Sequence, residues 1–175
     1  MIEMIAACVM VSILVPGISL IVRGTMMNIA FTNMAVLANM EADYAQRNFI
    51  KHINGVKSFS ATPNDLEADS MKFTCYLGNA VYAYKIDTDG SRTIKYSKDG
   101  GTAGILLQKV VKDTTIDAVN YVSKFTYRGK DNTDLGDTPT ATDVYGVELT
   151  FYLLRGESFY KYTTYATIDE DQLDI

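Results

Sequence analysis

The residue with the most demanding chemistry is Glu3, an acid that immediately precedes an uncharged, strongly apolar stretch at residues 4–22. A carboxylate at the mouth of such a stretch costs several kcal/mol to desolvate unless a positive group meets it. We therefore predict that Glu3 needs a positively charged partner. The first basic residue, Arg23, stands at the far end of the same stretch.

Other acidic residues gather in two turns that resemble fragments of calcium-binding loops. They are Asp87 and Asp89 before Gly90, and Asp131, Asp134 and Asp137 around Gly136. The full spacing of a calcium loop, which ends in a bidentate glutamate, is missing from both. We favour solvated turns, with calcium in an Asp-rich loop as the alternative and no other cofactor. The acidic residues 169–171 are expected to form a solvated face or tail.

One histidine, His52, and two cysteines, Cys8 and Cys75, limit the remaining chemistry. A single imidazole cannot build a cluster of histidine metal ligands, and no local motif indicates a Ser-His-Asp triad. Cys8 lies in the apolar stretch and Cys75 in a predicted strand, so we expect no disulfide between them. We predict that His52 is a satisfied or exposed helix residue and that the protein is not an enzyme.

Composition argues against nucleic-acid binding and in favour of one globular head. The 175-residue chain has a net charge of −5, and its 16 basic residues are scattered along the sequence. Phosphate binding requires clustered Lys or Arg. A hydrophobic fraction of 47% is ample for one core in addition to the apolar stretch.

The apolar stretch has three explanations. As a helix it would be about 28 Å long, close to the hydrocarbon thickness of a bilayer. A signal peptide has its basic residues before the apolar region and a small-x-small cleavage site after it, whereas the acid comes first here. A plain membrane anchor explains the apolarity but has no use for Glu3. We therefore favour a helix that assembles with other helices.

This helix is predicted to continue to Asn54-Gly55, because apolar residues keep a 3.6-residue spacing while polar residues appear between them. Pro16-Gly17 interrupts its first half, where a proline removes one backbone bond at a cost of about 3 kcal/mol, and Gly24 weakens a later turn. We expect a kink or a melted stretch there. The first half, with the transmembrane or filament-core segment 1–26, should project, and the second half should pack on the head.

The head, residues 57–175, is predicted to be an antiparallel β-sheet, which together with the helix at 1–56 gives an α+β fold. Strands are expected at 71–77, 80–86, 92–97, 105–111, 121–127, 144–154 and 159–168. A hairpin turn is expected at 155–158. Residues 57–70 should form a connector, and residues 128–143 an exposed, mobile loop.

The 12 tyrosines and 7 phenylalanines mostly alternate along these strands, where half-buried aromatics are common. We therefore expect them in the core and on the sheet surface. Tyr162 and Tyr165 are expected to be exposed.

This order of features resembles the type IV pilin and pseudopilin family. The likeness is carried by Met1-Ile2-Glu3-Met4-Ile5-Ala6-Ala7 and by the proline at Pro16, and it is confined to the helix. It implies that a prepilin peptidase removes a short basic leader and that the new N-terminus is methylated. It also implies that Glu3 neutralises the N-terminal amine of a neighbouring subunit as helices bundle.

The chain departs from the family pattern in several places. The family's glutamate usually lies deeper behind a leading phenylalanine, and its proline lies further from the glutamate. Either mature residues and the leader precede Met1, or the subunit has a shortened register. Many major pilins close a C-terminal loop with a disulfide, which this chain cannot do, and its head pattern is closer to that of the larger minor pseudopilins.

The resemblance implies a structural subunit of a type IV pilus-like filament that polymerises through its helix. Its assembly residues would be Met1, Glu3, Pro16, Gly17, Arg23 and Gly24. The alternative is a minor pseudopilin, a priming or tip component of a type II secretion-like system. Implied partners are identical subunits, other pilins, an inner-membrane assembly platform, the prepilin peptidase and, before assembly, the lipid bilayer. The chain would move from a prokaryotic inner membrane into an extracellular or periplasmic filament.

Overall fold

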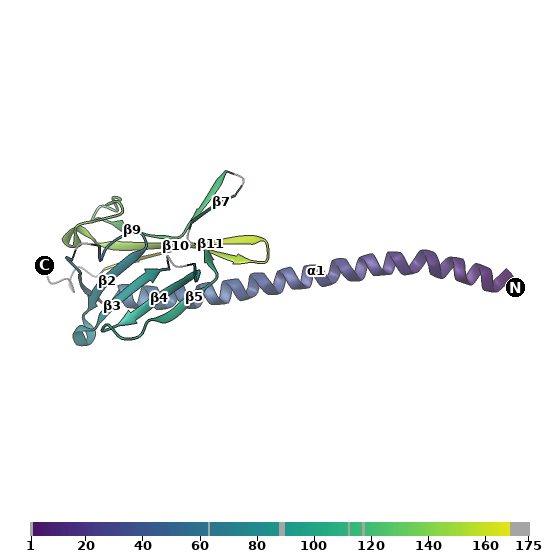
Figure 1. Ribbon diagram of the computed structural model, residues 1–175, viewed down its shortest axis with the longest axis horizontal. Coiled ribbons are helices and arrows are strands. Elements are labelled where there is room, and N and C mark those ends of the chain that lie inside the picture. The colour runs from purple at the N-terminus through teal and green to yellow at the C-terminus, as the bar shows by residue number, and fades with distance from the viewer. Residues whose placement is uncertain (1, 63, 88–89, 112, 117, 169–175) are drawn as a thin grey trace. The chain divides into compact units, whose positions relative to one another are not determined.

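The computed structural model describes the whole chain except residues 1, 63, 88–89, 112, 117 and 169–175. The chain divides into two compact units, Met1–Leu37 and Ala38–Ile175. One helix, α1 (Ile2–Ile53), begins in the first unit and ends in the second, close to the predicted end at Asn54-Gly55. Antiparallel strands follow it, so the α+β layout is confirmed (Figure 1).

The first unit is helical along its whole described length, including the turn at Pro16-Gly17. Of the two predicted alternatives, a kink or a melted stretch, the melted stretch is therefore wrong. A proline removes one backbone hydrogen bond, whereas melting the turn would expose several more groups that an apolar environment cannot satisfy. A continuous helix is the less costly outcome.

The first of two large sheets has the strand order β1-β2-β3-β4-β5, with every neighbouring pair antiparallel. The strands are β1 (Val56–Phe59), β2 (Ser70–Cys75), β3 (Val81–Ile86), β4 (Thr93–Lys98) and β5 (Gly104–Gln108). The predicted meander is confirmed as β2, β3 and β4. Its first turn uses Gly78 and Asn79 at φ of 77° and 52°. The expected connector 57–70, however, contains most of strand β1.

The second sheet is centred on β10, which pairs along its whole length with β11. Its other edge pairs with β9 and, further along, with β6. The strands are β6 (Val110–Val111), β9 (Lys124–Arg128), β10 (Gly146–Arg155) and β11 (Ser158–Thr167). The predicted hairpin turn is confirmed, since Arg155 pairs with Ser158 and Gly156 takes a φ of 62°.

Two predicted strands are wrong because each is split by a single residue. Lys109 adopts a φ of 60° and separates β5 in the first sheet from β6 in the second, so the apolar run 105–111 is not one strand. Ser123 divides 121–127, because its hydroxyl donates to the carbonyl of Val111 and accepts from the amide of Tyr152 at 3.1 Å. The residues before Ser123 form a separate hairpin of β7 (Asp113–Ile116) and β8 (Val119–Val122).

The second half of α1 supplies one wall of the head core. Five fully buried residues recur at spacings of three and four, which places them on one face of the helix. They are Ala38, Ala42, Ala45, Phe49 and Ile53. Phe49 lies between the sheets' aromatics, with ring centroids 5.9 Å from Tyr84 and 6.2 Å from Phe125. The predicted packing of this half on the head is confirmed.

Polar contacts also fix this half of the helix to the β10–β11 hairpin. The nearly buried Arg155 guanidinium donates to the Glu41 carboxylate. The Tyr162 hydroxyl donates to the Asn39 side chain at 2.7 Å, and the Tyr162 ring stacks on Phe151. Tyr162 is thus partly buried rather than exposed as predicted, whereas Tyr165 is exposed.

Tyr127 closes the turn before β2 from inside the core. Its ring is fully buried, and its hydroxyl lies 3.0 Å from the Glu67 carbonyl and 2.8 Å from the Ser70 carbonyl. Burial raises the pKa of this hydroxyl, so it stays a donor at all ordinary pH values. We predict that Tyr127→Phe lowers the free energy of unfolding by about 0.5–1.5 kcal/mol, because the carbonyls of Glu67 and Ser70 lose the hydroxyl donor and keep only their backbone amide donors.

Urea unfolding of the full chain in mild detergent measures this loss. Tyr76→Phe is the matched control, since Tyr76 is 61% exposed and should change stability little. Equal unfolding midpoints for the two variants would contradict the role given to Tyr127.

Candidate assembly surface

The first half of α1 presents an uninterrupted apolar surface. Every described residue from 2 to 34 is exposed in the isolated chain. Large side chains contribute throughout, such as Ile2 at 84% and Leu20 at 71% exposure. The helix is long and apolar enough to cross a membrane. A contiguous apolar surface of this extent is typical of a site that contacts a membrane or another protein.

Three hydroxyl groups within this surface, those of Ser12, Thr25 and Thr32, are satisfied by the helix itself. Ser12 donates to the carbonyl of Cys8 at 2.7 Å, and Thr25 donates to the carbonyl of Ile21 at 2.9 Å. Each bond joins residues four apart, so no water or second chain is needed. These residues can therefore enter surroundings without water at little cost.

The glycines in this surface have no explanation within the chain. A Cβ atom at Gly17 or Gly24 would meet nothing within 4 Å, and neither glycine has a positive φ. Each weakens a helix by about 1 kcal/mol relative to alanine. Small residues on an apolar helix let a second helix backbone approach closely. Gly17, which follows Pro16, and Gly24 thus mark places where a second helix can approach the backbone closely.

The two charges of this surface, Glu3 and Arg23, are not brought together by the fold. Twenty residues of continuous helix separate them, or about 30 Å at 1.5 Å per residue. Among the described residues, neither has an ion-pair or hydrogen-bond partner. Met1, the remaining predicted assembly residue, lies outside the described residues.

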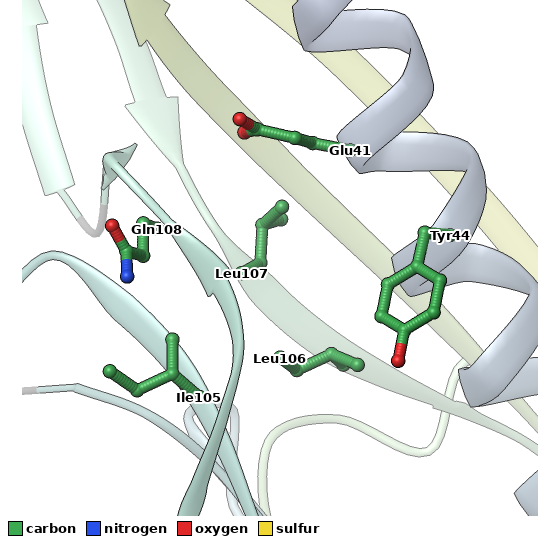
Figure 2. Close-up of a pocket in the computed structure, with 6 residues that line it drawn as sticks. All are labelled: Glu41, Tyr44, Ile105, Leu106, Leu107 and Gln108. Carbon is green, nitrogen blue, oxygen red and sulfur yellow. The ribbon is translucent and has the colours of Figure 1, made fainter.

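A groove on the head, which the sequence did not predict, lies between α1 and the edge strand β5. Figure 2 shows Glu41 and Tyr44 on the helix side and residues 105–108 on the strand side. The groove has a volume of about 210 Å³. Its rim exposes Tyr44 by 63% and Ile105 by 53%. The only sequence signal for the groove is Ile105. Within its apolar run, this residue cannot be distinguished from a residue of a core strand.

His52 is satisfied inside the head, as one of the predicted alternatives has it. One ring nitrogen, Nδ1, lies 2.5 Å from the Tyr84 hydroxyl, and the imidazole packs on Tyr82 with centroids 4.5 Å apart. Burial lowers the pKa of His52 below its ordinary 6.5, and the charges of Lys51 and Lys98 lower it further. The half-buried histidine thus packs against the aromatic side chains of Tyr82, Tyr84 and Tyr96.

This environment predicts a loss of stability in mild acid. The unfolded chain binds the proton at a higher pH than the folded chain, so the contribution of His52 is complete above pH 6.5 and declines as the pH falls toward its folded pKa. Urea unfolding at about pH 7.5 and about pH 5.5 measures this decline. His52→Gln keeps a hydrogen-bonding group and should flatten it; an unchanged decline in that variant would assign it to other groups.

The acidic turns are used in the fold. Asp87 is buried and pairs with Lys95 at 3.2 Å, so the prediction of a solvated turn is wrong for this residue; residues 88–89 lie outside the described residues. Asp134 accepts the amide of Gly136 at 2.9 Å, which closes its own turn. Within the described residues, no three His, Cys, Asp or Glu side chains are placed to hold a metal.

The cysteines are both free, as expected. Cys8 is exposed on the apolar helix and Cys75 is buried in the head. Burial raises the pKa of the Cys75 thiol, which makes it a poor nucleophile.

Comparison with protein families, curated proteins and solved structures finds no match to this chain, so the assignment of function depends on this geometry.

Proposed function

We propose that this protein is a structural subunit of a type IV pilus-like filament that polymerises through the first half of α1. The observation that carries the proposal is the exposed apolar helix whose only charges are Glu3 and Arg23. The hydroxyls of Ser12, Thr25 and Thr32 bond to carbonyls of the helix itself, and no contact within the chain explains Gly17 and Gly24. These properties suit a bundle of identical helices.

Assembly explains Glu3 better than membrane anchoring does. In an anchor the carboxylate gains nothing, whereas in a bundle it meets a positive group of another copy and two buried charges are satisfied together. The pilin resemblance implies the N-terminal amine of a neighbour for this role. Contacts of this kind join different surfaces of successive copies, so they do not close and an open filament results.

The same helix provides a place for the subunit before assembly. Because the helix is long and apolar enough to cross a bilayer, the subunit would wait in a prokaryotic inner membrane. There it would meet a prepilin peptidase and an assembly platform. It would then enter an extracellular or periplasmic filament of identical subunits and other pilins. We propose a structural rather than enzymatic role for the head, where His52 serves the core.

Electron microscopy of the purified full chain after detergent removal tests the proposal. Long uniform filaments made of this chain would support a repeating subunit. In the native cells, finding the chain at low copy beside another pilin would favour the alternative, a minor pseudopilin that primes or caps a secretion-like filament. Failure of the purified chain to form filaments, together with residence in the native membrane beside no other pilin, would contradict both.

A further inference from the structure

The charges of the apolar surface can be satisfied by each other only if two copies are displaced along their axes. Glu3 and Arg23 are the only charged residues at positions 2–40. About 30 Å of continuous helix separates them within one chain, so neither can reach the other. We propose that Arg23 of one subunit binds Glu3 of a second copy of this chain. This inference rests on the proposed function and names the register of its helices.

Helix geometry places the two charges on opposite faces. Twenty residues separate them, and at about 100° per residue this leaves a rotation of about 200° after whole turns are removed. Each subunit therefore uses one face to offer Glu3 to one neighbour and the opposite face to offer Arg23 to another. Two parallel helices displaced by about 30 Å bring the charges into contact. Because the two faces differ, the contact repeats from copy to copy without closing.

Arg23 supplies the electrostatic reason for this register. A guanidinium enclosed by apolar helices without a carboxylate is strongly unfavourable, and removing one member of a buried pair leaves the other uncompensated. Carboxylates after residue 40 begin with Glu41, which already accepts from Arg155, and Asp43, which pairs with Arg47 at 2.9 Å. Glu3 and Arg23 both lie on the exposed apolar surface, and neither has a partner among the described residues. Glu3 is therefore the carboxylate that remains for Arg23.

Charge exchange in the full chain tests the pair. Arg23→Glu and Glu3→Arg should each reduce the amount of polymer that sediments after detergent removal by at least about tenfold, because like charges meet in the bundle. The double variant Glu3→Arg/Arg23→Glu should restore polymer to within about threefold of the wild type, because the pair is re-formed in reverse. A double variant that stays defective overturns the Glu3–Arg23 pair. It would indicate instead that the partner of Glu3 is an N-terminal amine, which repels an arginine at position 3.

Cysteine cross-linking tests the register independently of charge. The test uses a Cys8→Ser background that also carries Met10→Cys and Ala30→Cys. Position 10 lies seven residues after Glu3, and position 30 lies seven residues after Arg23, so each is on the same helix face as that charge. Added oxidant should then produce a ladder of disulfide-linked subunits from the polymer. The control replaces Ala30→Cys with Leu37→Cys, which keeps the face but lies about 10 Å further along. A ladder from the control, or none from the Met10→Cys/Ala30→Cys pair, overturns the register.

The outcomes separate this inference from the proposed function. If Arg23→Glu assembles normally while Glu3→Gln does not, the filament proposal stands and the Arg23 pair is wrong. If the wild-type chain forms no polymer, the proposed function and the inference fail together. Circular dichroism of each variant in detergent should show an unchanged head, because residues 3 and 23 lie outside the core.

Discussion

Replacing Glu3 with glutamine is expected to abolish filament incorporation while leaving the head folded. The substitution keeps the size of the side chain and one acceptor oxygen, and it replaces the charged carboxylate with a neutral amide. A positive group of a neighbouring copy would then be buried without a partner, at about 3–5 kcal/mol. That loss corresponds to at least about a hundredfold weaker association. Sedimentation of the polymer and electron microscopy of the pellet measure it.

Asp43→Asn is the matched control for the loss of a carboxylate from the same helix. Asp43 is exposed and pairs with Arg47 four residues away, a type of contact that contributes about 0.3–0.5 kcal/mol. This variant should assemble as the wild type does. Normal assembly of Glu3→Gln would show that the carboxylate is not needed as a charge, which would remove the main support for the filament proposal.

The parts of the fold that sequence predicts correctly are those with local causes. The helix to Ile53 follows from a continuous apolar period and a Gly55 beyond its end. The first meander turn follows from Gly78-Asn79, since these residue types tolerate a positive φ. The exposed apolar surface at residues 2–34 is of the same kind, because an uncharged apolar run is visible without knowledge of the fold.

The parts that sequence misses depend on contacts between distant residues. Lys109 takes a left-handed conformation because the chain changes sheets there, and nothing in the run 105–111 indicates that change. Asp87 looks like a turn residue but is buried because Lys95 on β4 pairs with it. The groove beside Tyr44 exists because β5 ends the first sheet next to α1, which strand propensities do not specify.

Phe49→Ala is expected to have the largest effect on the stability of the head. The Phe49 side chain is fully buried and packs edge-to-face on Tyr84 and parallel to Phe125, so it joins the helix to both sheets. Removing its ring leaves a cavity that these rigid neighbours cannot fill, at about 3–5 kcal/mol of unfolding free energy. Urea unfolding of the full chain in mild detergent, followed by near-ultraviolet circular dichroism, measures the loss.

Tyr44→Ala is the matched control, because it removes an aromatic ring from the exposed side of the same helix. Its effect on the unfolding free energy should stay within about 0.5 kcal/mol. Alanine is the better helix former at both positions, so a similar loss in both variants could not come from helix propensity and would contradict the role given to the buried Phe49 ring. The contrast also separates the two halves of the helix: Phe49→Ala should weaken the head, whereas Glu3→Gln should weaken only assembly. If Phe49→Ala and Glu3→Gln both lost polymer while both heads stayed folded, the half of α1 that packs on the head would also belong to the assembly contact.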